Sequence, residues 1–237
     1  MNRPYMTQYA ENFTIDMFKN KDTLNIFSDA SMRTVEKSTN TLASCYGSVA
    51  VNADSIIDEV FRLQSISTVP AAEIRGIRCS LSLALKWRSE FRVINLFSDS
   101  QVAILGLRDY ISNWQYDMST NKYYIKSGKS RNYVKNQELY IECFRMLQEL
   151  CRTNIVNLFH QSGHIENGFN SIKRATNTFA KSNGIIGIVS YELIRYISVY
   201  NNYVDNKSRS FIRTTNVFDN QYIDAIEFYP TGNLYIN

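Results

Sequence analysis

The sequence predicts an α/β protein with a mixed five-stranded sheet flanked by helices and a C-terminal extension. Three observations support this. The first third of the chain contains β-prone runs separated by polar segments. Apolar runs of strand length then alternate with segments whose apolar residues recur at helical spacing. Acidic residues stand at the ends of two predicted strands. A hairpin sheet that continues into alternating helices and strands is expected to be mixed, with helices on its faces.

Composition sets the broad class of the protein. The chain has 237 residues, of which 44% are hydrophobic and 20% charged, as in ordinary globular proteins. A net charge of +4 permits nucleic-acid binding without arguing for it. The four cysteines form no CxxC pair, so free thiols in a reducing cytoplasm are expected and a zinc site is not. The N-terminal residues are too polar for a signal peptide, and no apolar run approaches the ~20 residues that span a bilayer. We therefore expect a soluble, cytoplasmic protein that does not bind membranes.

The first predicted unit is a polar arm over residues 1–22, followed by three antiparallel strands. Leu24–Ser28 is a short apolar run that stops at Asp29. Thr41–Val51 and Ile56–Ser67 carry β-branched and aromatic residues with partial alternation. These features are typical of a β-meander.

Helices and strands alternate in the next part of the chain. Pro70 suits the first turn of a helix, and apolar residues recur at helical spacing over Ala71–Ser89. Phe91–Phe97 is a continuous apolar run, which is typical of a buried parallel strand, and it ends at Asp99. Later predicted elements are a helix over Gln101–Trp114, a basic segment over 115–135, a helix over Asn136–Arg152, a strand over Ile155–Phe159, a loop over His160–His164, a helix over Asn167–Ser182, a helix over Ile185–Tyr200, and short strands over Ser210–Val217 and Asp224–Tyr229.

Three acidic residues are the candidates for chemistry. Asp29 and Asp99 end two strands in similar local sequences, FSDAS and FSDSQ, and Glu73 lies in the first turn of the predicted helix between them. Taken singly, Asp99 could cap a helix and Glu73 could complement a helix dipole. Together, carboxylates clustered at strand ends repel one another and need cations, and oxygen-rich sites suit Mg²⁺ or Mn²⁺. Two such ions about 4 Å apart can activate a water and stabilise the leaving oxygen in phosphodiester cleavage.

Five motifs in this order resemble the ribonuclease H family, meaning the type 1 cellular enzyme and its retroviral relatives. The similarity runs from about Leu24 to Gly184. The motifs are IFSDAS at Asp29, AAEIRGI at Glu73, NLFSDSQVAILGL at Asp99, VKNQELY at 134–140 and HQSGH at 160–164, followed by the helix ending ATNTFAKSNG.

The resemblance implies a metal-dependent endonuclease that hydrolyses the RNA strand of RNA–DNA hybrids and leaves 5′-phosphate ends. It implies two Mg²⁺ or Mn²⁺ ions per site, held by Asp29, Glu73 and Asp99. The family's fourth acid is expected where this sequence has Asn177, which offers a carbonyl oxygen without charge and should hold one ion more weakly. His164 matches a mobile histidine that assists product departure in the family.

The resemblance also implies how substrate is held. Relatives grip the DNA strand with a basic helix and loop, and the segment from Trp114 to Lys135 occupies that place. Phosphate contacts by basic residues should make binding weaken with salt, and aromatic side chains can stack on bases. The alternative is a solvated surface loop. The candidate nucleic-acid-binding residues are Trp114, Lys122, Lys126, Lys129, Arg131 and Lys135.

The resulting organisation is an N-terminal arm over 1–22, a ribonuclease H-like domain over 23–184, and an extension over 185–237 that packs on the domain or forms an interface. A monomer acting on RNA–DNA hybrid is expected. Two alternatives stay open, because one fold can host several functions. One is a DNA nuclease of the resolvase or integrase type. The other is a catalytically attenuated nucleic-acid-binding module, which Asn177 would favour.

Overall fold

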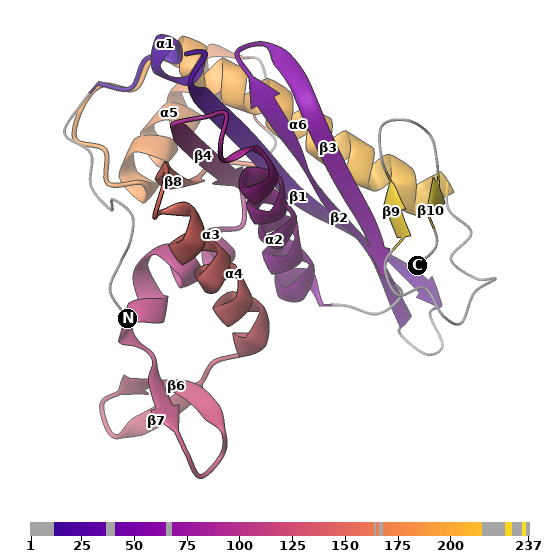
Figure 1. The fold of residues 1–237 in the computed structure, drawn as a ribbon, viewed down its shortest axis with the longest axis vertical. Coiled ribbons are helices and arrows are strands. Elements are labelled where there is room, and N and C mark those ends of the chain that lie inside the picture. The colour runs from indigo at the N-terminus through magenta and orange to yellow at the C-terminus, as the bar shows by residue number, and fades with distance from the viewer. Residues whose placement is uncertain are drawn as a thin grey trace.

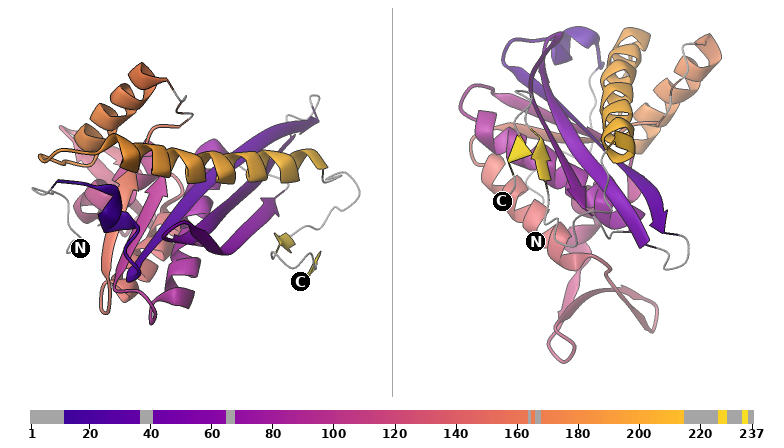
Figure 2. Two further views of the ribbon diagram at one scale, coloured as in Figure 1. Left: turned by 90° about the horizontal axis from the view of Figure 1, so that it is seen from above. Right: turned by 90° about the vertical axis from the view of Figure 1, so that its right-hand side faces the viewer.

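A mixed sheet runs through the molecule, with helices on both faces (Figures 1 and 2). The computed structural model describes residues 12–36, 41–64, 68–163, 165, 168–214, 226–228 and 234–235. The predicted five-stranded α/β sheet is confirmed, in the order β3-β2-β1-β4-β8, and β9 and β10 of the extension lengthen it beyond β3. The strands are β1 (Thr23–Glu36), β2 (Thr41–Asn52), β3 (Ser55–Gln64), β4 (Val93–Ser98), β8 (Ile155–His160), β9 (Ile226–Phe228) and β10 (Leu234–Tyr235).

Strand direction changes at β1, which explains why the sheet is mixed. β1 pairs antiparallel with β2, and β2 with β3, whereas β1–β4 and β4–β8 are parallel. β1 is longer than predicted, because its polar residues after Asp29 continue the antiparallel ladder with β2. Its parallel pairing with β4 stops at Ser28 opposite Ser98. The residues that follow these two, Asp29 and Asp99, therefore leave the parallel ladder side by side.

A row of three asparagines crosses the parallel strands and holds their register. Asn25, Asn95 and Asn157 are register partners on β1, β4 and β8. The Asn95 amide donates to Asn25 Oδ1 at 2.9 Å, and the Asn157 amide donates to Asn95 Oδ1 at 2.8 Å. A one-residue slip of a strand would leave buried amides without partners. This row therefore supports the alignment of the strand ends that carry the acids.

Each face of the sheet is covered by its own set of helices. On one face α2 packs against β1 and β2, and α3 and α4 complete an apolar cluster with it. On the other face α6 runs across β1 and β2, together with α1 and α5 (Figure 2). Phe27, Phe97 and Phe159 stack beneath that layer, with centroid distances of 4.7 and 5.3 Å. The helices are α1 (Ile15–Phe18), α2 (Val69–Trp87), α3 (Gln101–Leu105), α4 (Gln137–Leu150), α5 (Phe169–Ser182) and α6 (Tyr191–Thr214). None of these described helices is both long and apolar enough to cross a bilayer.

The extension departs from its prediction. The helix expected over Ile185–Tyr200 begins at Tyr191 and runs to Thr214. The strand predicted over Ser210–Val217 is therefore wrong for residues 210–214, and residues 215–217 lie outside the described part of the chain. The reason is packing: Leu193, Ile197, Val204 and Ile212 are all buried on one stripe of α6. The strand predicted over 224–229 is present as β9.

The segment after Asp99 also differs from its prediction. The helix expected over Gln101–Trp114 is α3 followed by a π-helical turn, η1 (Gly106–Tyr110), and a 3₁₀ turn, η2 (Ile111–Asn113). The basic segment forms a small antiparallel sheet that projects from the body (Figure 1). Its strands are β5 (Gln115–Asp117), β6 (Lys122–Ser127) and β7 (Ser130–Tyr133).

Candidate metal centre

Three carboxylates meet where the parallel strands end. Asp29 follows the last parallel pair of β1, Asp99 follows β4, and Glu73 faces them from α2. Each offers an oxygen that lies within 4.8 Å of the others. The structure thus brings together the three acids that the sequence singled out. Glu73 is the fifth residue of α2 and lies in its second turn, not the first as predicted, because α2 begins at Val69.

A close contact between α2 and β1 places Glu73 over the strand ends. Gly76 lies so near the strand that a Cβ there would stand 3.3 Å from the Asp29 carbonyl oxygen. The Ser48 hydroxyl donates to the Gly76 carbonyl at 2.9 Å and lies 2.9 Å from the Ser80 hydroxyl. The small residue and the buried serines let the helix approach the sheet without leaving polar groups unpaired.

The three carboxylates are close together and at least partly buried, so their ionised forms need a cation to compensate the negative charge. Burial, then Asp99 and Asp205, raise the pKa of Asp29 to about 8, and Asp29 is only 6% exposed. Burial, then Asp29 and Asp99, raise the pKa of Glu73 to about 9. Glu73 Oε2 is buried and has no hydrogen-bond partner in the described part of the chain. A divalent ion would supply the missing charge and a partner for this oxygen, so the residues fit Mg²⁺ or Mn²⁺.

A fourth carboxylate, Asp205 on α6, lies beside Asp29 but outside the group of three acids whose oxygens lie within 4.8 Å of one another. Sequence reasoning did not connect α6 with the site. The negative charge of Asp205 and its closeness to the Asp29 side chain add to the rise in the pKa of Asp29. Its side chain is 13% exposed, and Arg209 Nε lies 2.7 Å from its Oδ1. The predicted helix ended at Tyr200, which left Asp205 outside any element. Following the apolar stripe from Leu193 to Ile212 would have placed Asp205 on this helix.

The other predicted ligand lies elsewhere. Asn177 is on the exposed side of α5 and lines a groove of about 450 Å³ with the 187–191 segment. α5 packs against β8 and α6, and it is α6 that packs against β1. The structure therefore does not bring Asn177 to the acids.

The loop predicted to carry a mobile histidine passes beside Asp99. A Cβ on Gly163 would stand 2.6 Å from Asp99 Oδ2, so the main chain of the loop lies against the carboxylate. His164 itself lies outside the described residues. His160 is buried at the end of β8, and its ring contacts the main chain of Asp99.

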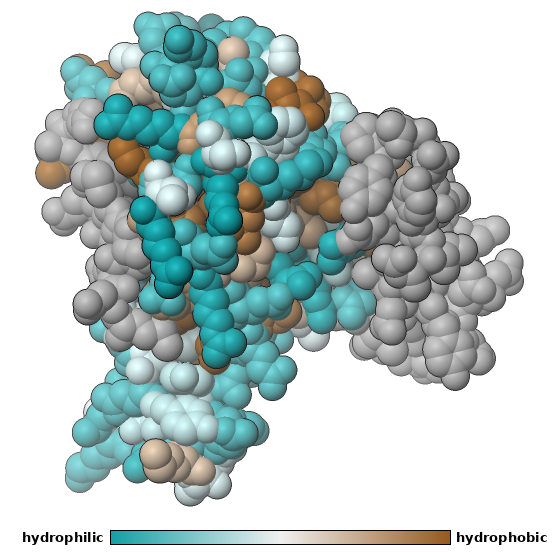
Figure 3. Space-filling model, in the orientation of Figure 1, coloured by the Kyte–Doolittle hydropathy of each residue, from teal (hydrophilic) through white to brown (hydrophobic). Residues whose placement is uncertain are grey.

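The predicted nucleic-acid-binding residues surround the projecting β5–β7 sheet. Trp114 is half-buried; its ring packs edge-on against Tyr140 at 5.4 Å. It lines a groove of about 1020 Å³ between α2, α3, the projecting sheet and α4. Figure 3 shows the surface of the projecting sheet as mostly hydrophilic. The five exposed basic residues are Lys122, Lys126, Lys129, Arg131 and Lys135, of which Arg131 pairs with Asp117 at 2.9 Å.

Comparison with known proteins identifies the family. The ribonuclease H family model matches residues 21–182. Searching the curated proteins gives no match. Among solved structures, the chain is similar to ribonuclease H1 of the halophilic archaeon Halobacterium salinarum NRC-1, with 19% identity, 68% of this chain and 93% of that chain covered, and a TM-score of 0.40. The prototype foamy virus ribonuclease H domain shows 15% identity, 76% and 94% coverage, and a TM-score of 0.44. LC11 ribonuclease H1, solved in complex with RNA/DNA hybrid, shows 13% identity, 58% and 85% coverage, and a TM-score of 0.37. Because the family model covers more than half of the sequence, the chain belongs to the ribonuclease H family of hydrolases.

Proposed function

We propose that this protein hydrolyses the RNA strand of RNA–DNA hybrids with two Mg²⁺ or Mn²⁺ ions. The observation that carries the proposal is the convergence of Asp29, Glu73 and Asp99, whose oxygens lie within 4.8 Å of one another. Two of these carboxyl groups are buried enough to have strongly raised pKa values in the absence of metal. Such a cluster is costly unless cations compensate it.

Asp205 is proposed as the fourth metal ligand in place of Asn177. Asp205 lies close enough to Asp29 to raise the pKa of that carboxyl, whereas Asn177 lines the groove beside the 187–191 segment. With Asp205 the site has four carboxylates, a formal charge suited to two divalent ions if Asp205 exchanges its pairing with Arg209 for a metal. This argues against an attenuated binding module. When bound, the ions supply activation of the attacking water and stabilisation of the leaving oxygen. Because α6 contributes this ligand, the catalytic unit is proposed to continue past residue 184 through α6.

The substrate is proposed to extend from the acids across the groove between α2, α3 and α4 to the projecting sheet. Lys135 and Trp114 line that groove. The basic side chains of β6 and β7 are exposed, so these side chains can bind phosphates of the nucleic acid. The solved structure of a foamy viral protease-reverse transcriptase in complex with RNA/DNA hybrid is of similar fold, as is that of LC11 ribonuclease H1. The protein is proposed to act as a monomer in the cytoplasm, and all four of its cysteines are free thiols.

A cleavage assay with labelled duplexes tests the function. RNA–DNA hybrid, duplex DNA and a four-way DNA junction are each incubated with Mg²⁺ or Mn²⁺. The expected result is cutting of the RNA strand of the hybrid alone, with 5′-phosphate and 3′-hydroxyl ends. Asp29→Asn should abolish it. Absence of cutting by the wild type, or equal cutting by the variant, would reject the proposal. Preferential cutting of the junction would instead assign a resolvase-type activity.

A further inference from the structure

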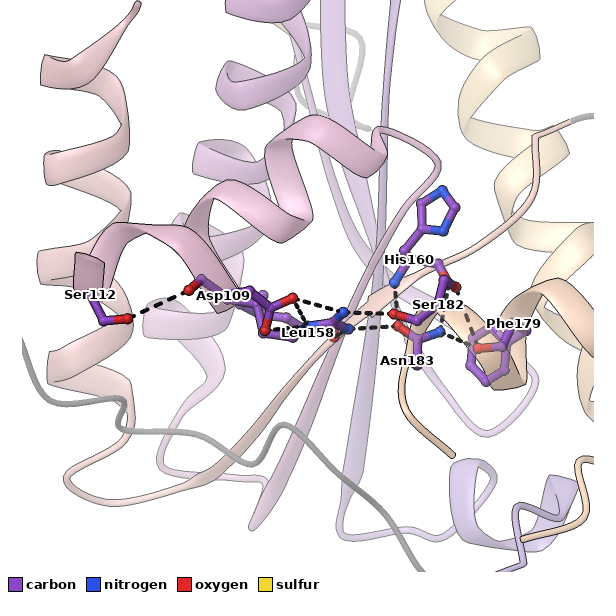
Figure 4. Close-up of polar contacts among 8 residues, drawn as sticks. Asp109, Ser112, Leu158, His160, Phe179, Ser182 and Asn183 are labelled. Carbon is purple, nitrogen blue, oxygen red and sulfur yellow. Dashed lines mark hydrogen bonds and ion pairs between the residues drawn. The ribbon is translucent and has the colours of Figure 1, made fainter. Parts of the chain in front are cut away.

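A buried arginine on the π-helical turn after Asp99 ties three elements together. Figure 4 labels four of its partners, Asp109, Leu158, Ser182 and Asn183. Arg108 is 4% exposed. Its Nη1 donates to the Leu158 carbonyl at 3.2 Å and to Asn183 Oδ1 at 2.8 Å. Its Nη2 donates to the Ser182 carbonyl at 2.6 Å and pairs with Asp109 at 3.1 Å. A buried guanidinium needs several acceptors to offset its desolvation, and here they come from η1, β8 and the end of α5.

Asn183 connects Arg108 to the last residue of β8, His160, through hydrogen bonds to the His160 main chain. It accepts a hydrogen bond from the His160 main-chain N–H at 2.8 Å and donates to the His160 carbonyl at 2.7 Å. It also donates to the Phe179 carbonyl at 2.9 Å, which anchors it to its own helix. β8 is the edge strand of the sheet, so the Asn183 amide pairs with His160 as a neighbouring strand would.

The clamped strand end lies directly against Asp99. His160 is the register partner of Ser98, and the Gln161 N–H donates to the Ser98 carbonyl at 3.0 Å. The His160 ring contacts the Asp99 main chain, and Gly163 abuts the Asp99 carboxylate. These contacts form a closed loop. The chain runs from Asp99 through α3 to Arg108 on η1, Arg108 binds Asn183, Asn183 binds the His160 main chain, and the end of β8 contacts Asp99.

We propose that Arg108 and Asn183 are positioning residues for the Asp99 carboxylate. They hold the end of β8 and the 161–163 turn against Asp99, so that this carboxylate is set in place before metal and substrate bind. Neither residue belongs to the acid cluster, and both act through main-chain groups of β8 and α5. The inference rests on the proposed function, because it concerns the geometry of that same site.

The other end of β8 provides a matched control. Asn154 is 9% exposed, and its amide donates to the Arg88 carbonyl at 2.8 Å and the Phe91 carbonyl at 2.6 Å. Like Asn183, it is a buried asparagine at one end of β8 whose amide donates to two main-chain carbonyls, and we call each such residue a clamp. β8 has six residues, so the two clamps are separated by a strand of roughly 20 Å. A purely structural role would make the two clamps equivalent in function.

The test compares Asn183→Ala, Arg108→Lys and Asn154→Ala for thermal melting, Mn²⁺ binding by calorimetry, and kcat and KM on labelled hybrid. All three variants should lose thermal stability. Asn183→Ala and Arg108→Lys should lower kcat by about 10- to 100-fold with KM nearly unchanged. Lysine keeps the charge, but its single compact ammonium cannot span the separated acceptors on β8, at the end of α5 and on Asp109 that the planar guanidinium reaches. Asn154→Ala should keep kcat within about twofold of the wild type.

Equal losses of kcat in Asn183→Ala and Asn154→Ala would overturn the positioning role, as would a change confined to KM. Inactivity of the wild type would instead overturn the proposed function. The positioning role is then decided by Mn²⁺ binding alone. Weaker binding in Asn183→Ala than in Asn154→Ala supports it, and equal binding overturns it.

Discussion

Asp205 on α6 lies beside Asp29 on β1 and raises the pKa of that carboxyl, which links the helix layer behind the sheet to the acids at its edge. Carboxylates this close disfavour each other's ionised form, and this is one of the causes that raise the pKa of Asp29. A bound divalent cation would offset the repulsion.

Replacing Asp205 should weaken metal binding, whereas replacing Asn177 should not. Asp205→Asn removes one charge from the cluster, and we expect a loss in Mn²⁺ affinity and hybrid cleavage on the order of 10- to 100-fold. Asn177→Ala changes an exposed residue of α5 and should leave both quantities as in the wild type. Calorimetry and the cleavage assay measure them side by side. The opposite ranking of the two variants would return the fourth ligand to Asn177.

Without divalent metal, the protein should lose stability as pH rises. The folded-state pKa values of Asp29 and Glu73 are raised from 3.8 to about 8 and from 4.5 to about 9. Their contribution is thus fully present below the ordinary carboxyl pKa and is lost as pH rises through the folded-state values. Melting temperatures measured with chelator from about pH 5 to about pH 9 should fall, and Mn²⁺ should oppose the fall.

The same linkage sets the effect of a neutral substitution. Asp29→Asn removes the ionisation, so it should flatten the pH dependence and raise metal-free stability by roughly 1 kcal/mol. Metal binding near neutral pH should also release protons, which calorimetry in two buffers of different ionisation enthalpy detects. A melting temperature that climbs with pH in chelator would contradict the assigned direction.

Charge removal on the projecting sheet should lower the salt dependence of hybrid binding. Lys126 and Lys129 are exposed there, and removing one phosphate contact should reduce the slope of log K against log salt by about 0.7 to 0.9. A Lys126→Gln, Lys129→Gln double variant removes two such charges and should show about twice this reduction in binding titrations over a range of salt. The control, Lys173→Gln with Arg174→Gln, removes the same charge from the exposed side of α5. Equal slopes for the two double variants would show that the projecting sheet does not touch phosphates.

A methyl group at Gly163 should disturb activity more than stability. The added Cβ would stand 2.6 Å from Asp99 Oδ2, a distance that forces the carboxylate or the loop to shift. Gly163 is exposed, so the fold itself should tolerate the change. We expect Gly163→Ala to cut hybrid at least about tenfold more slowly with a melting temperature close to that of the wild type. Gly168→Ala, where a Cβ meets nothing within 4 Å, serves as the control.

Local patterns along the chain determined the strands of the main sheet and the three acids at their ends. The apolar runs ending at Asp29 and Asp99, and the helical spacing around Glu73, depend only on residues that are neighbours in sequence, so the sequence by itself was enough to locate them. These acids converge because the register of β1 and β4 brings Ser28 opposite Ser98.

Tertiary packing alone decided the rest. α5 and α6 are both amphipathic, and nothing local says which of them lies across β1, yet that choice places Asp205 at the site and leaves Asn177 on the exposed side of α5. The basic segment becomes a projecting sheet, and Arg108 becomes a buried clamp, through partners far away in sequence. Contacts of this kind depend on which surfaces meet in the folded chain, and the spacing of residues does not encode that directly.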